Sequence, residues 1–217
     1  MNTTENAEQK ITNGIKSFFE WSFSNIQTIG IASAIIIGAI LIGSVFVLRQ
    51  KEAHETQLTN LAIAEKFIGQ KQYPNAEKIL TEIKNKNPKK NVLLPTLYYL
   101  GDIATHSNSL DKALEYLNEA KGISNNSPFL PLILSNIGFV YEEKKDFSSA
   151  ADTYRQFMNS FSEHFMSPRI QYSLGKTLVL SGKNDEGRKE LERLVDLYPS
   201  SKWAEKSRIM MDKSKTR

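Results

Sequence analysis

Cysteine is absent from the 217-residue sequence. Without cysteine the chain forms no disulfide, has no thiol nucleophile and has no residue for lipoprotein attachment. Histidine is scarce as well, because His54, His106 and His164 lie at least 52 residues apart, which is not a spacing of metal ligands. Adjacent carboxylates such as Glu142 and Glu143 are expected at turns or on solvent-facing sides of helices. We therefore expect no metal, no cofactor and no enzyme activity.

Strong charge of either sign is also missing. The formal net charge is +4 and the pI is about 9.1, because lysines are scattered along the chain. The densest basic segment, residues 84–90, includes Pro88 and is expected to be a solvated loop. The glycines occur singly, so the sequence has no phosphate-binding loop. These patterns argue against a nucleic-acid partner and against a small-molecule substrate.

One long segment carries no charge at all. No charged residue occurs between Glu20 and Arg49, and the core of this interval, residues 28–48, is 21 residues long. A helix rises about 1.5 Å per residue, so the core would cover roughly 30 Å, the hydrocarbon thickness of a bilayer. We therefore expect a transmembrane helix at residues 26–49. A cleaved signal peptide should be shorter and end in small residues, and a soluble helix is rarely apolar on every face.

Small residues recur at four-residue spacing within this segment. They form two rows along the expected helix: Gly30, Ala34 and Gly38, and Ala39 and Gly43. Helix backbones approach closely at such rows, which would allow another transmembrane helix, or a second copy of this chain, to dock there. The alternative is that Gly and Ala are simply frequent in membrane-spanning helices.

Residues 1–25 form an N-terminal tail that allows two interpretations. Apolar residues at helical spacing favour an amphipathic helix on the membrane surface, with Trp21 and Phe23 in the interfacial aromatic belt. These apolar residues are Ile11, Ile15, Phe18, Phe19 and Ile26. The alternative is an unstructured tail.

The basic residues beside the uncharged segment leave the topology open. Lys10 and Lys16 precede the segment, and Arg49 and Lys51 follow it. Because both ends carry positive charge, the positive-inside rule does not select a side of the membrane.

The rest of the sequence contains an internal repeat of 37 residues. Small residues recur at this period at two positions that are twelve residues apart, and a large residue follows the second position by four. The three sets are Ala64, Gly101, Gly138 and Gly175; Ala76, Ala113, Ala150 and Gly187; and Leu80, Leu117, Tyr154 and Leu191. Two antiparallel helices need such small residues where their axes cross closely. The period therefore predicts a stack of helical hairpins.

The limits of the hairpins follow from helix-start and turn residues. The expected pairs are 52–70 with 74–86, 92–106 with 110–122, 129–144 with 147–161, and 168–181 with 184–197. A last helix at about 201–213 would cover the open end of the stack, with Trp203 against the preceding pair. We therefore expect an all-α solenoid of about four hairpins and a capping helix in residues 50–217.

The repeat resembles the tetratricopeptide repeat over about residues 57–200. The residues that carry the likeness are Leu100 and Gly101, Gly138 and Tyr141, Ala113 and Ala120, and the closing prolines Pro88 and Pro199. The period of 37 is three residues longer than the usual 34. Ala64 replaces the first glycine in the first repeat, and Gly187 replaces the alanine in the fourth.

The order of segments is similar to that of the bacterial YfgM family. The shared layout is a short tail, one span, and a small repeat domain that ends in a Tyr198-Pro199-Ser200-Ser201 turn and a helix with Trp203 and Ala204. This resemblance implies an ancillary subunit of the SecYEG translocon in the bacterial inner membrane. It also implies a periplasmic repeat domain and, as a partner, a membrane-anchored periplasmic chaperone.

Tetratricopeptide geometry further implies a binding groove, lined by the first helix of each hairpin. It selects an aromatic ladder of Tyr98, Phe139 and Tyr172. Around the ladder it places Asp102, Ser135, Glu142, Arg169 and Lys176. Aromatic anchors with a polar surround are typical of a peptide-binding groove. The alternative is that some of the aromatic residues belong to the core between repeats.

These patterns predict a membrane-anchored scaffold for other proteins. The span would raise the local concentration of the repeat domain near its partners, and the groove would bind an extended or helical segment. Two alternatives stay open: an envelope-assembly or division scaffold with no link to the translocon, and an inward-facing receptor for cytosolic chaperones or clients.

Overall fold

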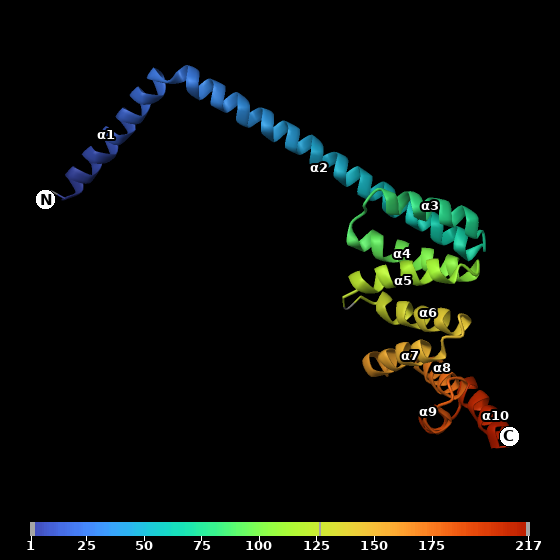
Figure 1. Cartoon of the computed structure of the whole chain (residues 1–217). Helices are drawn as coiled ribbons and strands as arrows, with labels where there is room; N and C mark the ends of the chain where they lie inside the picture. The colour runs from blue at the N-terminus through green and yellow to red at the C-terminus, as the bar shows by residue number, and fades with distance from the viewer. Residues whose placement is uncertain (1–2, 126, 216–217) are drawn as a thin grey trace. The chain divides into compact units, whose positions relative to one another are not determined.

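A computed structural model describes residues 3–125 and 127–215, and every regular element within these residues is an α-helix (Figure 1). The chain divides into two compact units, Met1–Glu55 and Thr56–Arg217. The boundary falls inside the helix α2, Ile26–Gly69, so this helix contributes residues to both units.

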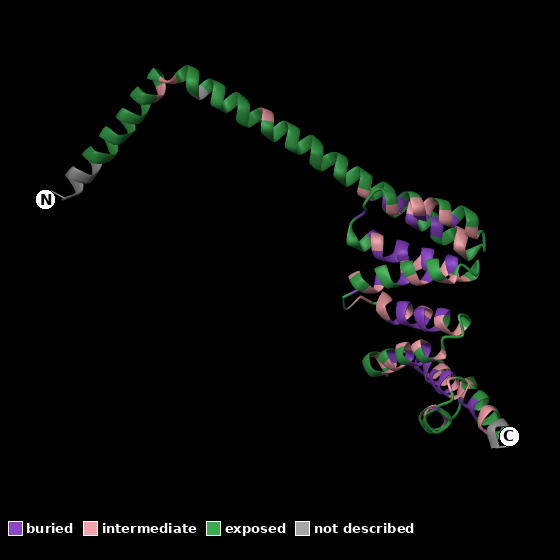
Figure 2. Ribbon diagram, viewed as in Figure 1, coloured by how far each residue is buried: buried purple, intermediate pink, exposed green. Residues whose placement is uncertain are grey.

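The first unit consists of α1, Thr3–Ser24, and the N-terminal part of α2. By length and composition, α2 could cross a membrane, because an 18-residue window has a mean hydropathy of 2.7 and none of it is buried. The tail is helical, and apolar side chains of α1 such as Phe18 and Trp21 are exposed (Figure 2). The location of α1 on a membrane surface stays a prediction.

The second unit contains the C-terminal part of α2 and eight further helices. These are α3 Tyr73–Asn85, α4 Lys90–His106, α5 Leu110–Ile123, α6 Phe129–Glu143, α7 Phe147–Phe161, α8 Ser167–Leu180, α9 Asn184–Leu197 and α10 Lys202–Lys215. They form successive hairpins, and α10 packs on α8 and α9 at the end of the stack. The predicted all-α hairpin solenoid with a capping helix is confirmed.

The close helix crossing predicted from the small residues is present in each hairpin whose first helix contains the repeat glycine, which is Gly101, Gly138 or Gly175. A Cβ atom added at Gly101 would lie 2.6 Å from Cγ of Leu117, and one at Gly138 would lie 2.4 Å from Cε1 of Tyr154. Carbon atoms do not approach this closely, so the large residue sixteen positions later occupies the space that a side chain would need. Each first helix is thereby locked against its second helix at one fixed register.

The turn inside each hairpin also repeats every 37 residues. Lys71, Asn108, Lys145 and Gly182 all have positive φ, between 58° and 88°. The amide of the next residue donates to the carbonyl five positions earlier, as in the bond of 2.8 Å from Ser109 N to Ala104 O. This geometry is a Schellman motif, which satisfies carbonyl groups at the end of the first helix. Four turns of one geometry therefore set the antiparallel pairing.

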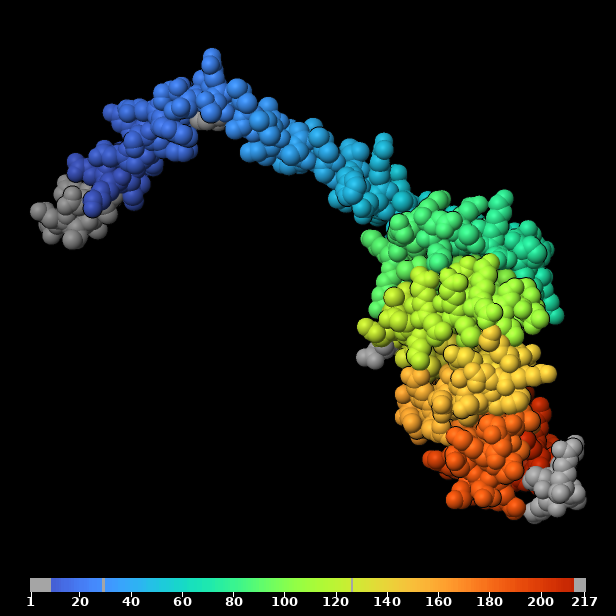
Figure 3. Space-filling view, in the orientation of Figure 1, coloured from blue at the N-terminus to red at the C-terminus, as the bar shows by residue number. Residues whose placement is uncertain are grey.

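Three hydrophobic clusters join the hairpins into one stack. Each cluster combines both helices of a hairpin with the first helix of the next one, and Leu80, Leu117 and Tyr154 each contribute to one of the clusters. Buried residues therefore lie between the helices of this unit (Figure 2), and the repeats follow one another without a break in its surface (Figure 3). No hairpin buries its apolar face alone, as expected of a solenoid.

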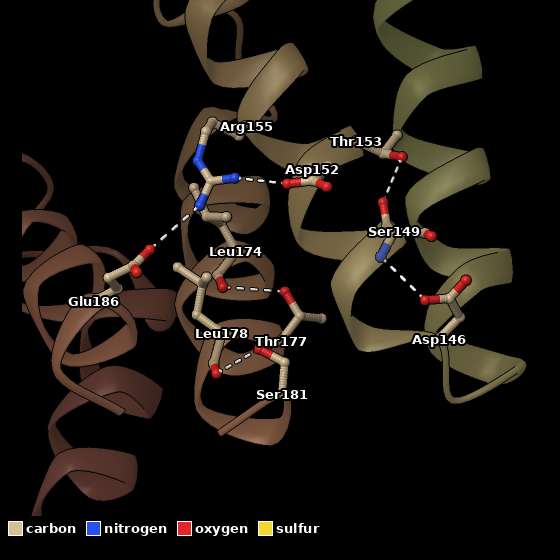
Figure 4. A network of polar contacts seen from close by, with 10 residues as sticks. All are labelled: Asp146, Ser149, Asp152, Thr153, Arg155, Leu174, Thr177, Leu178, Ser181 and Glu186. Carbon is tan, nitrogen blue, oxygen red and sulfur yellow. Dashed lines mark hydrogen bonds and ion pairs between the residues drawn. The ribbon is translucent and has the colours of Figure 1, made fainter. Parts of the chain in front are cut away.

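Polar contacts add links at the surface of the stack (Figure 4). Asp146 caps α7 by accepting a hydrogen bond of 3.1 Å from the backbone N–H of Ser149. Arg155 of α7 contacts Asp152 at 2.7 Å and Glu186 of α9 at 3.6 Å. Because these ion pairs are exposed, they contribute little to stability, about 0–1 kcal/mol each.

At Gly187 the backbones of α8 and α9 themselves lie in close contact, and replacement of this glycine by alanine tests the packing. A Cβ atom there would lie 2.7 Å from the carbonyl oxygen of Gly175 and 2.8 Å from the backbone N of Val179. Backbone atoms cannot move aside as a flexible side chain can. We expect Gly187→Ala to lower the free energy of unfolding by about 1–3 kcal/mol in urea denaturation.

Gly122 provides the matched control. It lies near the end of α5, is exposed, and has no atom within 4 Å of an added Cβ. Alanine has the higher helix propensity, so Gly122→Ala is expected to leave stability unchanged or raise it by up to about 1 kcal/mol. Equal stability of Gly187→Ala and the native chain would contradict the close crossing of α8 and α9.

Candidate functional site

The eight predicted groove residues lie on the first helices of three successive hairpins. Their positions are Tyr98 and Asp102 on α4, Ser135, Phe139 and Glu142 on α6, and Arg169, Tyr172 and Lys176 on α8. The helices α4 and α6 contact each other directly. An ion pair between Glu142 and Lys176 links α6 to α8.

Two of the three aromatic residues of the ladder contact other aromatic rings, and the third is exposed. The ring centroid of Tyr98 lies 5.6 Å from that of Phe129, and the ring centroid of Tyr172 lies 5.5 Å from that of Trp203 on α10. Phe139 is 37% exposed. Part of each tyrosine therefore belongs to packing between helices, whereas Phe139 offers an open ring. Whether the three rings bind one ligand stays a prediction.

Ser135 is 1% exposed, so its hydroxyl is closed to a ligand in this structure. Ser135, Tyr98 and Tyr172 occupy the same repeat position, three residues before the glycine. This position turns toward a neighbouring helix. Phe139, one residue after its glycine, is more open. The sequence did not reveal this difference, because the period of the repeat does not report the rotation of each helix.

One polar network connects α4 to α6. Nδ2 of Asn136 donates a hydrogen bond of 3.3 Å to Oδ1 of Asp102, and Nδ1 of His106 lies 3.8 Å from Oδ2 of the same carboxylate. Burial raises the pKa of Asp102, and the contacts with His106 and Asn136 oppose that rise. Burial also raises the pKa of Tyr98, with a further contribution from the charge of Asp102. Asn136 and His106 were not among the predicted residues.

A second network connects α6, α7 and α8. The Glu142 side chain is only 9% exposed, forms an ion pair with Lys176, and accepts a hydrogen bond of 2.8 Å from the hydroxyl of Tyr154. The Tyr154 ring passes over Gly138 to reach this position. Burial, followed by the charge of Glu142, raises the pKa of Tyr154 well above its usual range. Two predicted groove charges, Glu142 and Lys176, thus neutralise each other.

Arg169 is the second positively charged residue of the predicted groove, and unlike Lys176 it forms no ion pair with a described residue. Its side chain is exposed and forms no hydrogen bond or ion pair with any residue in the described ranges. Its positive charge offsets a small part of the rise that burial causes in the pKa of Tyr98 and in the pKa of Tyr154. Whether the open ring of Phe139 and the guanidinium of Arg169 bind a segment of another protein stays a prediction.

The small residues of α2 are open in the structure. No atom lies within 4 Å of a Cβ added at Gly30, Gly38 or Gly43. Ala34 and Ala39 lie in the same exposed part of the helix. The predicted docking of another helix along these rows stays a prediction.

The comparisons with known proteins agree with this architecture. A profile described as tetratricopeptide repeat matches residues 170–201, which cover most of α8 and α9. The chain has the tetratricopeptide repeat fold. The repeats predicted from the 37-residue period are thereby confirmed. A search of curated proteins finds no match.

Several solved structures share the fold. A tetratricopeptide repeat protein from Parabacteroides merdae matches with a TM-score of 0.64 and 18% identity over 76% of this chain and 61% of that one. MamA from Desulfovibrio magneticus matches with a TM-score of 0.60 and 17% identity over 74% of this chain and 88% of that one. PilF from Pseudomonas aeruginosa has a TM-score of 0.57 and 15% identity over 71% and 66%, respectively. Identities this low establish the repeat fold alone.

The raised pKa of Tyr154 predicts that the stability of the fold changes in alkaline solution. An unfolded tyrosine loses its proton near pH 10, whereas folded Tyr154 keeps its proton to higher pH. The free energy of unfolding should therefore fall above pH 10, by up to about 1.4 kcal/mol per pH unit for each such tyrosine. We expect Tyr154→Phe to make this fall shallower, and to cost about 1–3 kcal/mol at neutral pH because Glu142 loses a donor.

Urea denaturation between pH 8 and 11 measures both effects. Tyr198→Phe is the control, since it removes an exposed hydroxyl that contacts Ser162 O at 3.3 Å, and it should retain the native pH dependence. An unchanged alkaline slope in Tyr154→Phe would contradict the burial of this hydroxyl against Glu142.

Proposed function

We propose that this protein is a membrane-anchored, non-catalytic scaffold that captures a segment of another protein on the inner face of its repeats. The observation that carries the proposal is the tetratricopeptide repeat fold, which is a protein-interaction scaffold. In this chain the open side chains Phe139 and Arg169 provide an apolar and a cationic anchor.

The membrane anchor in this proposal is the uncharged part of α2. Its length and its exposed apolar side chains support a span. The first repeat helix is the continuation of the same helix as far as Gly69. A span restricts the repeats to the neighbourhood of a membrane and thereby raises their effective concentration for partners there. The open small-residue rows, which include Gly30 and Gly38, would dock another span or a second copy of the chain.

We assign the protein to the bacterial inner membrane, with the repeats in the periplasm and with the Sec translocon and a periplasmic chaperone as partners. The support for this assignment is the resemblance of the layout to the YfgM family. An envelope-assembly or division scaffold is the alternative, because the same fold and the same kind of anchor would serve it equally.

Protease accessibility in spheroplasts tests the topology. If the repeats are periplasmic, added protease should cleave the chain in intact spheroplasts, and the loop between α7 and α8, where Phe165 is 81% exposed, offers a cleavage site. A cytosolic marker protein must stay intact in the same sample. Cleavage only after lysis of the spheroplasts would instead support the inward-facing receptor.

Photocrosslinking at Phe139 tests the groove. A photoreactive phenylalanine analogue at position 139 should crosslink to a partner in native membranes, and mass spectrometry should identify translocon or chaperone subunits. The control is the same analogue at Phe165, which is 81% exposed but lies in the loop between α7 and α8. We expect little crosslinking from this position.

Phe139→Ala should reduce recovery of the same partner at least about tenfold, as expected when an aromatic anchor is lost. Its urea denaturation should stay close to that of the native chain, because the ring is partly exposed. Equal crosslinking from positions 139 and 165 would contradict capture on the inner face.

A further inference from the structure

Three lysines lie at the first connection between hairpins, up to the first residue of α4. Lys86, Lys89 and Lys90 are exposed, and no side-chain nitrogen of the three forms a hydrogen bond or ion pair with another residue that the structure describes. The nearby Lys84 differs, because its Nζ lies 3.3 Å from Glu119. We call Lys86, Lys89 and Lys90 the entry lysines. Their charge is locally uncompensated, since the sequence has no acidic residue from position 83 to position 101.

The loop that carries the entry lysines is held in place by its neighbours. Pro88 is buried, and Ile83 and Val92 on either side of the loop pack in one cluster with Leu61 of α2. Lys89 is the N-cap of α4 and provides no side-chain hydrogen bond to the helix end. The positive end of a 17-residue helix therefore adds to the lysine charges.

The entry lysines lie where the chain enters the repeat unit. The helices α2 and α3 are antiparallel, with Ala64 and Leu80 in the same cluster, so the end of α3 at Asn85 returns toward Thr56. Within this unit, the loop after α3 lies on the side at which α2 enters (Figure 1). Thr56 is seven residues from Arg49, a span of at most roughly 25 Å even for extended chain.

We propose that the entry lysines bind the anionic headgroups of the bilayer that holds α2. The inference rests on the membrane anchor of the proposed function. The seven-residue connection only limits how far Thr56 can lie from the headgroups near Arg49. Each ammonium group that comes close to an anionic surface adds attraction. The attraction acts over a Debye length of about 8 Å at physiological salt.

The chemistry of the cluster favours a lipid surface over a shaped ligand site. Lysine is a point charge on a flexible stem and lacks the fixed fork by which arginine recognises one carboxylate or phosphate. Three exposed lysine charges can instead interact with several lipid phosphate groups at a membrane surface at the same time.

Lysine reactivity in nanodiscs tests the proposal with the full chain. One set of discs contains phosphatidylcholine alone, and the other contains about 30% phosphatidylglycerol. Acylation of each lysine is followed by mass spectrometry. We expect the entry lysines to react about threefold or more slowly in the anionic discs. The difference should vanish at about 1 M salt, where the Debye length is about 3 Å. Lys71, Lys145 and Lys183, which are exposed at the turns inside hairpins, should react equally in both discs.

A pair of matched variants provides a second measurement. Lys86→Gln, Lys89→Gln and Lys90→Gln together should abolish the slowing of hydrogen exchange that anionic discs cause at residues 84–92. The control replaces Lys71, Lys145 and Lys183 by Gln, removes the same charge, and should retain the slowing.

Four outcomes would overturn the proposal. Equal lysine reactivity in both discs would exclude lipid binding, and a failure of the chain to insert into any disc would remove the anchor itself. Equal protection by inorganic phosphate in neutral discs would indicate a soluble anion as the ligand. Protection by polyglutamate but not by anionic lipid would indicate an acidic protein partner.

Discussion

The structure of the repeat unit depends on the close contact between the two helices of each hairpin. At Gly138 the space that a side chain would fill is taken by the ring of Tyr154, and at Gly101 it is taken by Leu117. This contact fixes how far each second helix slides along the first. Once the register is set, the remaining apolar faces can be buried only against the next hairpin, and the stack follows.

The same contact also determines which of the predicted groove residues are engaged by other side chains. Because the Tyr154 ring passes over Gly138, its hydroxyl reaches Glu142, and Glu142 also binds Lys176. Core packing, charge pairing and the candidate groove are therefore parts of one arrangement. The ring of Phe139 and the guanidinium of Arg169 stay exposed in this arrangement.

Much of this architecture could be predicted from the sequence, because the residues that carry it are locally distinctive. The 37-residue period of small residues indicated the hairpins and their order. The rotation of each helix about its axis was not encoded so directly, so the burial of Ser135 and the contact of Tyr172 with Trp203 emerged only in the structure. The left-handed turns at Lys71 and Lys145 were also missed, since glycine, the usual residue there, is absent from both.

Amide hydrogen exchange at the four hairpin turns tests the central claim most directly. The amides of Gln72, Ser109, Asp146 and Lys183 donate to carbonyls five residues earlier at 2.8–2.9 Å, and they recur every 37 residues. If the hairpins form one repeated structure, all four amides should exchange much more slowly than an unprotected amide in the same chain. Rapid exchange at these positions, or protection that does not follow the period, would contradict the account.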